Sequence, residues 1–95
     1  MNPIIISNEI LLKLKDKHNV SRREVEQCFE NRIGVYLEDD REEHRTDPPT
    51  LWFVAPTNQN RLLKIIFVFS NGNIYIKSAY DAKQHIVDLY EECGR

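Results

Sequence analysis

The dipeptide Asn71-Gly72 is the feature that most restricts the fold of this chain. It joins two strand-like segments, "LLKIIFVF" at 62–69 and "IYIKSA" at 74–79. An Asn-Gly pair between such segments favours a type I′ turn, in which both turn residues have positive φ. A two-residue turn pairs Ser70 with Asn73 and fixes the register of the pairs that follow. The sequence therefore predicts an antiparallel hairpin with two defined faces.

The two predicted faces differ in polarity, because cross-strand partners share a face. One face, which we call the second face, carries Lys64, Lys77 and Tyr75. An even-length turn over "PTNQN" would add Phe53 to this face and place Trp52 on the opposite, first face. The first face is almost entirely apolar and is expected to lie under helices; it carries Ile65, Phe67, Phe69, Ile74 and Ile76.

The rest of the chain predicts helices before and after the strand segments in the sequence. Ser7 or Asn8 can cap a helix that runs to residue 18, and the spacing of Ser21 and Glu24 is that of a capping box for a second one. Segments 3–6, 33–37 and 51–55 are typical of strands, and a last helix is expected to begin at 81–84. This order predicts an α+β fold with two N-terminal helices packed on one face of an antiparallel meander sheet of about four strands, plus a C-terminal helix.

Composition and length favour a single domain over residues 1–95. The chain is 41% hydrophobic and 29% charged, as in an ordinary soluble globular protein. It has no apolar run near the roughly 18 residues that a membrane span needs, and no secretory signal. Cys28 and Cys93 lie far apart without metal-ligand spacing, so both are expected to be reduced thiols. These features predict a cytoplasmic protein with no membrane partner and no cofactor.

The second face of the hairpin suggests an RNA-binding surface. The net charge of −2 argues against bulk attraction to nucleic acid, so any anion site would be local. Lys64 and Lys77 can hold phosphates, while Phe53 and Tyr75 can stack on bases, and this combination is what single-stranded RNA binding requires. The alternative is that these are ordinary scattered lysines and aromatic rings on the exposed face of a small sheet.

A charged loop, "LEDDREEHRTDPP" at 37–49, precedes the strand at 51–55. We expect this loop to bring Arg41, His44 and Arg45 over bound phosphates, and a histidine titrates near neutral pH, as proton transfer requires. The acidic residues of the loop suit either a divalent cation or a self-paired solvated loop, and we prefer the second, so no metal is predicted. They are Glu38, Asp39, Asp40, Glu42, Glu43 and Asp47. His18 is expected to end the first helix, where an imidazolium favours the helix dipole, and His85 to lie on the surface.

Four segments in this order resemble the BrnT-like toxins: "KHNVSRREVEQCF", "LEDDREEHR", "RLLKIIFVF" and "GNIYIKSAYDA". The resemblance covers roughly residues 10–83, and it extends to a related small domain of unassigned function. BrnT-like toxins are small RelE/ParE-type ribonucleases of bacterial type II toxin–antitoxin modules. The resemblance implies a single RelE-like domain, RNA as substrate (with ribosome-associated mRNA among the candidates), and an antitoxin encoded next to the protein.

The resemblance also implies a chemistry that needs no metal or cofactor. The 2′-OH of the RNA attacks the adjacent phosphorus, so the protein must orient the phosphate, balance its charge and move protons. By position, Arg45 matches the basic residue after the acidic loop of the family, and Arg61 matches the arginine that begins the long strand. Tyr80 stands where the family usually has arginine, which transfers the expected work to Tyr80 and Lys77. The predicted catalytic set is His44, Arg45, Arg61, Lys64, Lys77 and Tyr80, and the predicted RNA-binding set is Phe53, Tyr75 and Arg41.

Two other functions stay open at this point. A non-catalytic RNA- or protein-binding module of the same fold is favoured by Tyr80 in place of arginine and by the acidic balance of the chain. Proteins of this appearance have also been labelled ADP-ribosyl-(dinitrogen reductase) hydrolases. The true enzymes of that activity are larger, all-helical and bind two metals, so this third function fits the sequence poorly.

Overall fold

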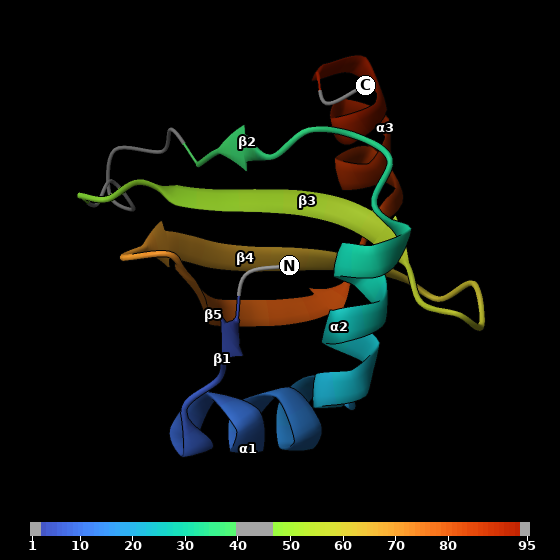
Figure 1. The fold of residues 1–95 in the computed structure, drawn as a ribbon. Coiled ribbons are helices and arrows are strands. Elements are labelled where there is room, and N and C mark those ends of the chain that lie inside the picture. Colours follow the sequence, from blue (N-terminus) through green and yellow to red (C-terminus); the bar gives the residue numbers. More distant parts are fainter. Residues whose placement is uncertain (1–2, 40–46, 94–95) are drawn as a thin grey trace.

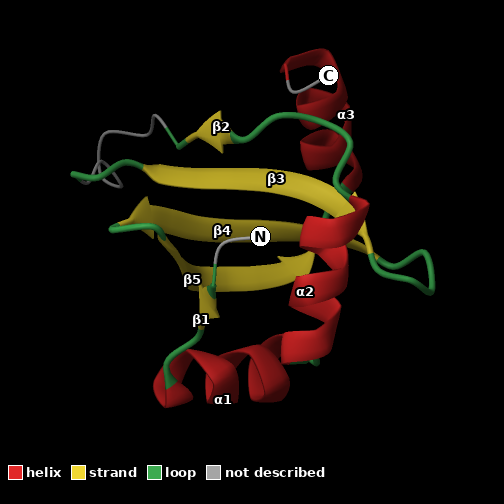
Figure 2. Ribbon diagram, in the orientation of Figure 1, coloured by secondary structure: helices red, strands yellow, loops and turns green. Residues whose placement is uncertain are grey.

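The computed structural model describes residues 3–39 and 47–93, which form helices on both faces of one sheet (Figures 1 and 2). The predicted α+β fold is confirmed. The sheet has five strands in the order β1-β5-β4-β3-β2, and β1 pairs with β5 in parallel while the other pairs are antiparallel. The elements are β1 (Ile4–Ile5), α1 (Asn8–His18), α2 (Arg22–Asn31), β2 (Leu37–Glu38), β3 (Thr50–Pro56), β4 (Leu62–Ser70), β5 (Asn73–Asp81) and α3 (Gln84–Cys93).

Local side-chain chemistry fixes the ends of the first two helices as predicted. The Ser7 hydroxyl accepts a hydrogen bond from the backbone N–H of Ile10 at 3.2 Å and caps α1. Asn19 ends α1 in the left-handed conformation, with φ of 53°. Ser21 and Glu24 form the reciprocal capping box of α2. The two helices are therefore separated by a short, well-defined corner.

The β4–β5 hairpin has the predicted turn, but a bulge changes its register. Asn71 and Gly72 have φ of 54° and 79°, as a type I′ turn requires. The predicted pairs hold as far as Phe67 and Ile76, after which Lys77 is an extra residue in β5. Because of this bulge, Lys64 pairs with Tyr80, whereas a regular register would have paired it with Ala79.

The β3–β4 connection also differs from the even-length turn that would have exposed Phe53. The Thr57 N–H donates to the Arg61 carbonyl at 2.9 Å, and three residues lie between them, with Asn60 at φ 65°. An odd loop exchanges the faces of every residue on the preceding strand. Phe53 consequently pairs with Ile65 on the face that the N-terminal helices cover. The expectation that Phe53 lies on an open face is wrong.

The face under α1 and α2 holds an aromatic core. Phe53 is 0% exposed, and its ring centroid lies 4.8 Å from that of Phe29 in α2 and 6.1 Å from that of Phe67 in β4. These edge-on contacts are the preferred geometry for aromatic pairs. Helix α2 crosses β3 and β4, while α1 packs beside β5 (Figure 1).

Helix α3 covers part of the opposite face, which is the second face. Successive side chains of a strand point to opposite sides, so Trp52 lies on this face. Its ring is 5.8 Å from the Tyr90 ring of α3, and the Tyr90 hydroxyl donates to the Val35 carbonyl at 2.7 Å. None of the helices in residues 3–39 and 47–93 has the length and apolarity to cross a membrane.

Both cysteines are free thiols, as expected, but in different environments. Cys93 is exposed, whereas Cys28 is fully buried on α2 with its thiol 3.4 Å from the Ala55 carbonyl. Burial raises the pKa of the Cys28 thiol to about 12; the negative charge of Glu24 adds to this shift and Arg61 opposes it. Cys28 is therefore a neutral core side chain at physiological pH.

Candidate functional site

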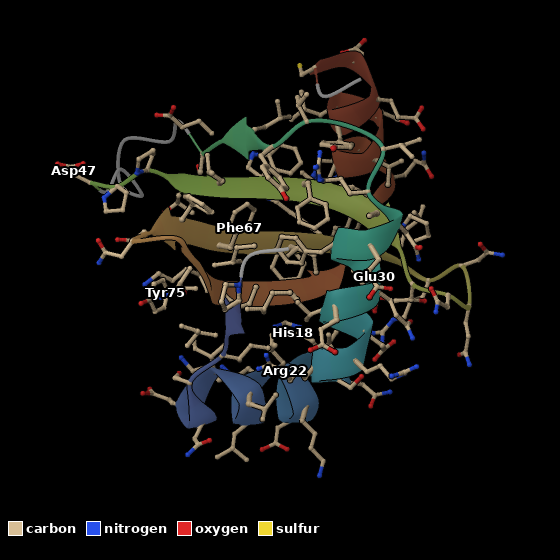
Figure 3. The ribbon with its side chains drawn as sticks, viewed as in Figure 1. His18, Arg22, Glu30, Asp47, Phe67 and Tyr75 are labelled. Atoms are coloured by element: carbon tan, nitrogen blue, oxygen red, sulfur yellow. The ribbon has the colours of Figure 1, made fainter. Side chains whose placement is uncertain are left out.

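The structure separates Phe53 from Tyr75, two of the three predicted RNA-binding residues. Phe53 lies in the core. Tyr75 lies at the end of β5 next to the hairpin turn, where its hydroxyl is 3.4 Å from the side-chain amide nitrogen of Asn73. Figure 3 shows Tyr75 there and His18 at the junction of α1 and α2. Lys77 is exposed in the bulge. The three predicted loop residues lie outside the described part of the chain: Arg41, His44 and Arg45.

Three of the predicted catalytic residues do converge, at the end of the sheet far from the hairpin turn. Tyr80 and Lys64 are cross-strand partners there, and Arg61 precedes β4. Arg61 and Tyr80, together with the end of α1, border an open polar cleft of about 520 Å³, and Lys64 lies behind Tyr80 outside its lining. Basic and acidic side chains both line this cleft: Asp16, Lys17, His18, Asn19, Arg61, Tyr80, Asp81 and Lys83.

The Tyr80 ring is the centre of a row of side chains that ends in the cleft. The His18 imidazole lies on one side, with ring centroids 5.4 Å apart and planes tilted by 49°. The Lys64 ammonium lies 6.0 Å from the Tyr80 centroid and 4.6 Å from the Trp52 centroid, within cation–π range of both rings. Lys64 is only 9% exposed. We call His18, Tyr80 and Lys64 the cleft row.

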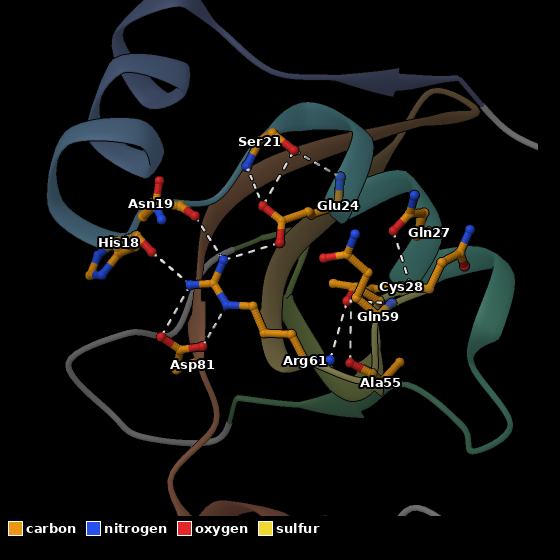
Figure 4. Close-up of polar contacts among 12 residues, drawn as sticks. His18, Asn19, Ser21, Glu24, Gln27, Cys28, Ala55, Gln59, Arg61 and Asp81 are labelled. Carbon is orange, nitrogen blue, oxygen red and sulfur yellow. Dashed lines mark hydrogen bonds and ion pairs between the residues drawn. The ribbon is translucent and has the colours of Figure 1, made fainter.

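The Arg61 guanidinium gives all five of its N–H groups to the protein (Figure 4). Nε and Nη2 donate to the two Asp81 carboxylate oxygens at 2.7 and 3.1 Å. Nη2 also donates to the His18 carbonyl at 2.8 Å. Nη1 donates to the Asn19 carbonyl at 2.7 Å and to Glu24 at 3.1 Å. This arrangement, the Arg61 clamp, joins the ends of α1 and β5 to the first turn of α2.

The clamp also sets the electrostatics of the cleft. The hydrogen bonds from Arg61 hold the pKa of the Asp81 carboxyl below its usual value, and the charges of Arg61 and His18 act in the same direction. In return, the hydrogen bond to Asp81 raises the pKa of Arg61 above its already high value. Asp81 is therefore an anion and Arg61 a cation over the whole physiological pH range.

His18, Trp52 and Asp81 are among the members of this region that the sequence did not indicate. His18 was expected only to favour the dipole at the end of α1, and Trp52 was expected under the helices. The segment "KHN" does mark the helix end at which His18 lies. Its contact with Tyr80 also requires α1 to pack beside β5, and no local pattern predicts that packing. The face on which Trp52 lies depends on whether the β3–β4 loop has an odd or an even number of residues.

Neither a metal-binding group among the described residues nor a matching protein family identifies the function of this cleft. Among residues 3–39 and 47–93 there is no group of three or more His, Cys, Asp and Glu side chains that could hold a metal ion. Of the charged-loop acids, Asp40, Glu42 and Glu43 lie outside the described residues. No protein-family model matches the chain, and no curated protein matches it.

Proposed function

We propose that this protein is a small endoribonuclease of the RelE/ParE type that cleaves RNA at the polar cleft without a metal. The observation that carries the proposal is the cleft row, in which an imidazole contacts a tyrosine ring that also has a lysine ammonium near it. Lys17 and Lys83 add positive charge to the lining of the same cleft. The order of the sequence segments that resemble BrnT-like toxins supports the same class.

The proposed reaction requires three catalytic functions from the protein: a base, an acid and a positive charge. A base takes the proton of the RNA 2′-OH, whose oxygen bonds to the adjacent phosphorus while the bond from phosphorus to the 5′-oxygen breaks. An acid protonates that leaving oxygen, and the products are a 2′,3′-cyclic phosphate and a 5′-hydroxyl. His18 and Tyr80 are the proton-transfer groups in this proposal, and Lys64 balances the charge on phosphorus. We propose a cytoplasmic location and an antitoxin partner encoded next to the protein.

The test is cleavage of a short single-stranded RNA, and of mRNA on purified ribosomes, in the presence of a metal chelator. We expect products with 2′,3′-cyclic phosphate ends. General acid–base groups typically contribute about 10²–10⁴-fold in rate, so His18→Gln and Tyr80→Phe should each lower cleavage by at least about 100-fold. The matched control is His85→Gln, since His85 is an exposed histidine on α3. Intact RNA after incubation with the folded wild-type protein would exclude the enzyme.

The Arg61 clamp favours a second candidate, a non-catalytic RNA- or protein-binding module. The one arginine that lines the cleft within the described residues gives its donors to the protein. Tyr80 also stands where the BrnT-like toxins that the sequence resembles usually have arginine. If the module binds RNA, Lys17→Ala with Lys83→Ala should weaken a salt-dependent RNA affinity, measured by fluorescence anisotropy, while the wild type leaves the RNA uncut. The same two substitutions in an active ribonuclease should lower cleavage as well as binding.

A further inference from the structure

We infer that Arg61 is a positioning residue that holds the His18 imidazole against Tyr80. Its effect on cleavage rests on the proposed function, but its effect on geometry does not. Arg61 was predicted as a member of the catalytic set. The structure gives its guanidinium other partners, and two of them are backbone groups at the residue that carries the imidazole and at the next residue.

The end of α1 leaves two carbonyl groups for Arg61. Asn19 turns left-handed, and its N–H donates back to the Lys15 carbonyl at 3.2 Å, while the Val20 N–H donates to the Leu14 carbonyl at 2.9 Å. This is the usual way in which a helix end satisfies its earlier carbonyls. The carbonyls of His18 and Asn19 accept from Arg61 instead, so the guanidinium fixes the peptide groups on both sides of Asn19.

The other end of the clamp is attached to the strand that carries Tyr80. Asp81 directly follows Tyr80 in β5, and its carboxylate receives two hydrogen bonds from Arg61. A single atom, Nη2 of Arg61, donates both to the His18 carbonyl and to Asp81 (Figure 4). The two rings of the cleft row are thus carried by chain segments that one guanidinium joins, and their separation of 5.4 Å follows from that link.

A lysine cannot replace Arg61 in this role. The guanidinium is planar and presents its donors as a rigid fork, whereas an ammonium is a compact charge on a flexible stem. Arg61→Lys therefore keeps the positive charge but cannot hold two carbonyls and two carboxylate oxygens in one plane. The end of α1 should then move relative to β5, and His18 should leave the Tyr80 ring.

The decisive measurement is the proton NMR spectrum of the His18 ring, assigned by comparison with His18→Gln. In the wild type the Tyr80 ring should shift these resonances, and nuclear Overhauser contacts should connect the two rings. In Arg61→Lys the resonances should move toward those of an exposed histidine and the contacts should weaken. The matched control is Arg23→Lys, because Arg23 is an exposed arginine on α2, and it should leave both signals unchanged.

If the protein cleaves RNA, Arg61→Lys should lower kcat by about 10²-fold and change KM little, since misplacement of a reacting group by an ångström has a cost of that order. A folded Arg61→Lys protein with wild-type His18 resonances and ring contacts would overturn the inference. If Arg61→Lys does not fold, Asp81→Ala decides by the same spectrum, because it removes both acceptor oxygens of the clamp and keeps the guanidinium. Unchanged resonances would again overturn the inference. Loss of the ring contacts in Arg61→Lys, together with a wild type that leaves RNA intact, would support the inference and refute only the proposed function.

Discussion

Trp52 and Phe53 are neighbours on β3, yet they belong to two different regions of the molecule. Phe53 is 0% exposed and packs among aromatic rings under α2. Trp52 is 7% exposed on the second face, where it lies between Tyr90 of α3 and the ammonium of Lys64. Both are buried, but an apolar layer covers one and a helix together with a charged side chain covers the other.

This difference distinguishes an apolar face of the sheet from a face that also carries a buried charge. The face under α1 and α2 is filled by apolar side chains, and burying these is the main favourable contribution to folding. The second face carries a charge next to rings and leads through Tyr80 to the polar cleft. Trp52, Val54 and Tyr90 of the second face also belong to the buried core. Substitution of a core side chain on either face should therefore lower the free energy of unfolding, whereas substitution in the cleft row should mainly change the proposed function.

The largest expected effect is that of Phe53→Ala. Removing a fully buried phenylalanine leaves a cavity and typically lowers the free energy of unfolding by about 3–5 kcal/mol. Urea denaturation measures this loss. Phe69→Ala is the matched control, because Phe69 is 44% exposed on β4, and its cost should be about 1 kcal/mol or less. A Phe53→Ala protein of wild-type stability with weakened RNA binding would restore the base-stacking role that burial excludes.

The parts of the fold that local chemistry fixes could be predicted from the sequence. The caps at Ser7 and Ser21 and the left-handed pair at Asn71 and Gly72 each depend on side chains within a few residues of one another. The order of helices and strands followed from these signals and from the apolar pattern. The parallel pairing of Ile4 and Ile5 with β5 was not predicted, because it joins segments at opposite ends of the chain.

The predictions that were wrong depend on whether a loop or a strand contains one residue more or one fewer. The odd loop after Thr57 and the bulge at Lys77 each shift the register by one residue, and that exchange decides which face a side chain occupies. Phe53 and the pairing of Lys64 were wrong for this reason. The candidate site fared likewise: Arg61, Lys64 and Tyr80 do converge, but the contact between His18 and Tyr80 depends on long-range packing that residue patterns do not contain.

A smaller effect is expected from Asp81→Asn, which removes the carboxylate through which the Arg61 clamp holds the end of β5. Arg61 depresses the pKa of Asp81 in the folded state, so the pair stabilises the protein above the ordinary carboxyl pKa of 3.8 and loses this contribution as the pH falls through the folded value. The Asp81 side chain is 68% exposed, so the loss at neutral pH should be only about 0.5–1 kcal/mol. Urea denaturation at pH 7 and at pH 3 should show the two proteins converging in acid. A difference that stays constant with pH would mean that the carboxylate charge is not what stabilises the clamp.

The smallest change in stability is expected from Lys64→Met, on the second face. Methionine keeps a stem of similar length and removes the ammonium near Trp52 and Tyr80. Such a cation–π contact is worth about 0.5–2 kcal/mol, and burial of the apolar replacement in place of a charge offsets most of this loss. Trp52 is the only tryptophan of the chain, so its fluorescence emission should report the loss of the ammonium directly. Lys77→Met, which alters an exposed lysine in β5, should leave that emission unchanged. If the cleft row cleaves RNA, Lys64→Met should lower cleavage strongly at nearly unchanged stability, the opposite of Phe53→Ala. A loss of stability as large as that of Phe53→Ala would instead show that both faces of the sheet hold the fold together in the same way.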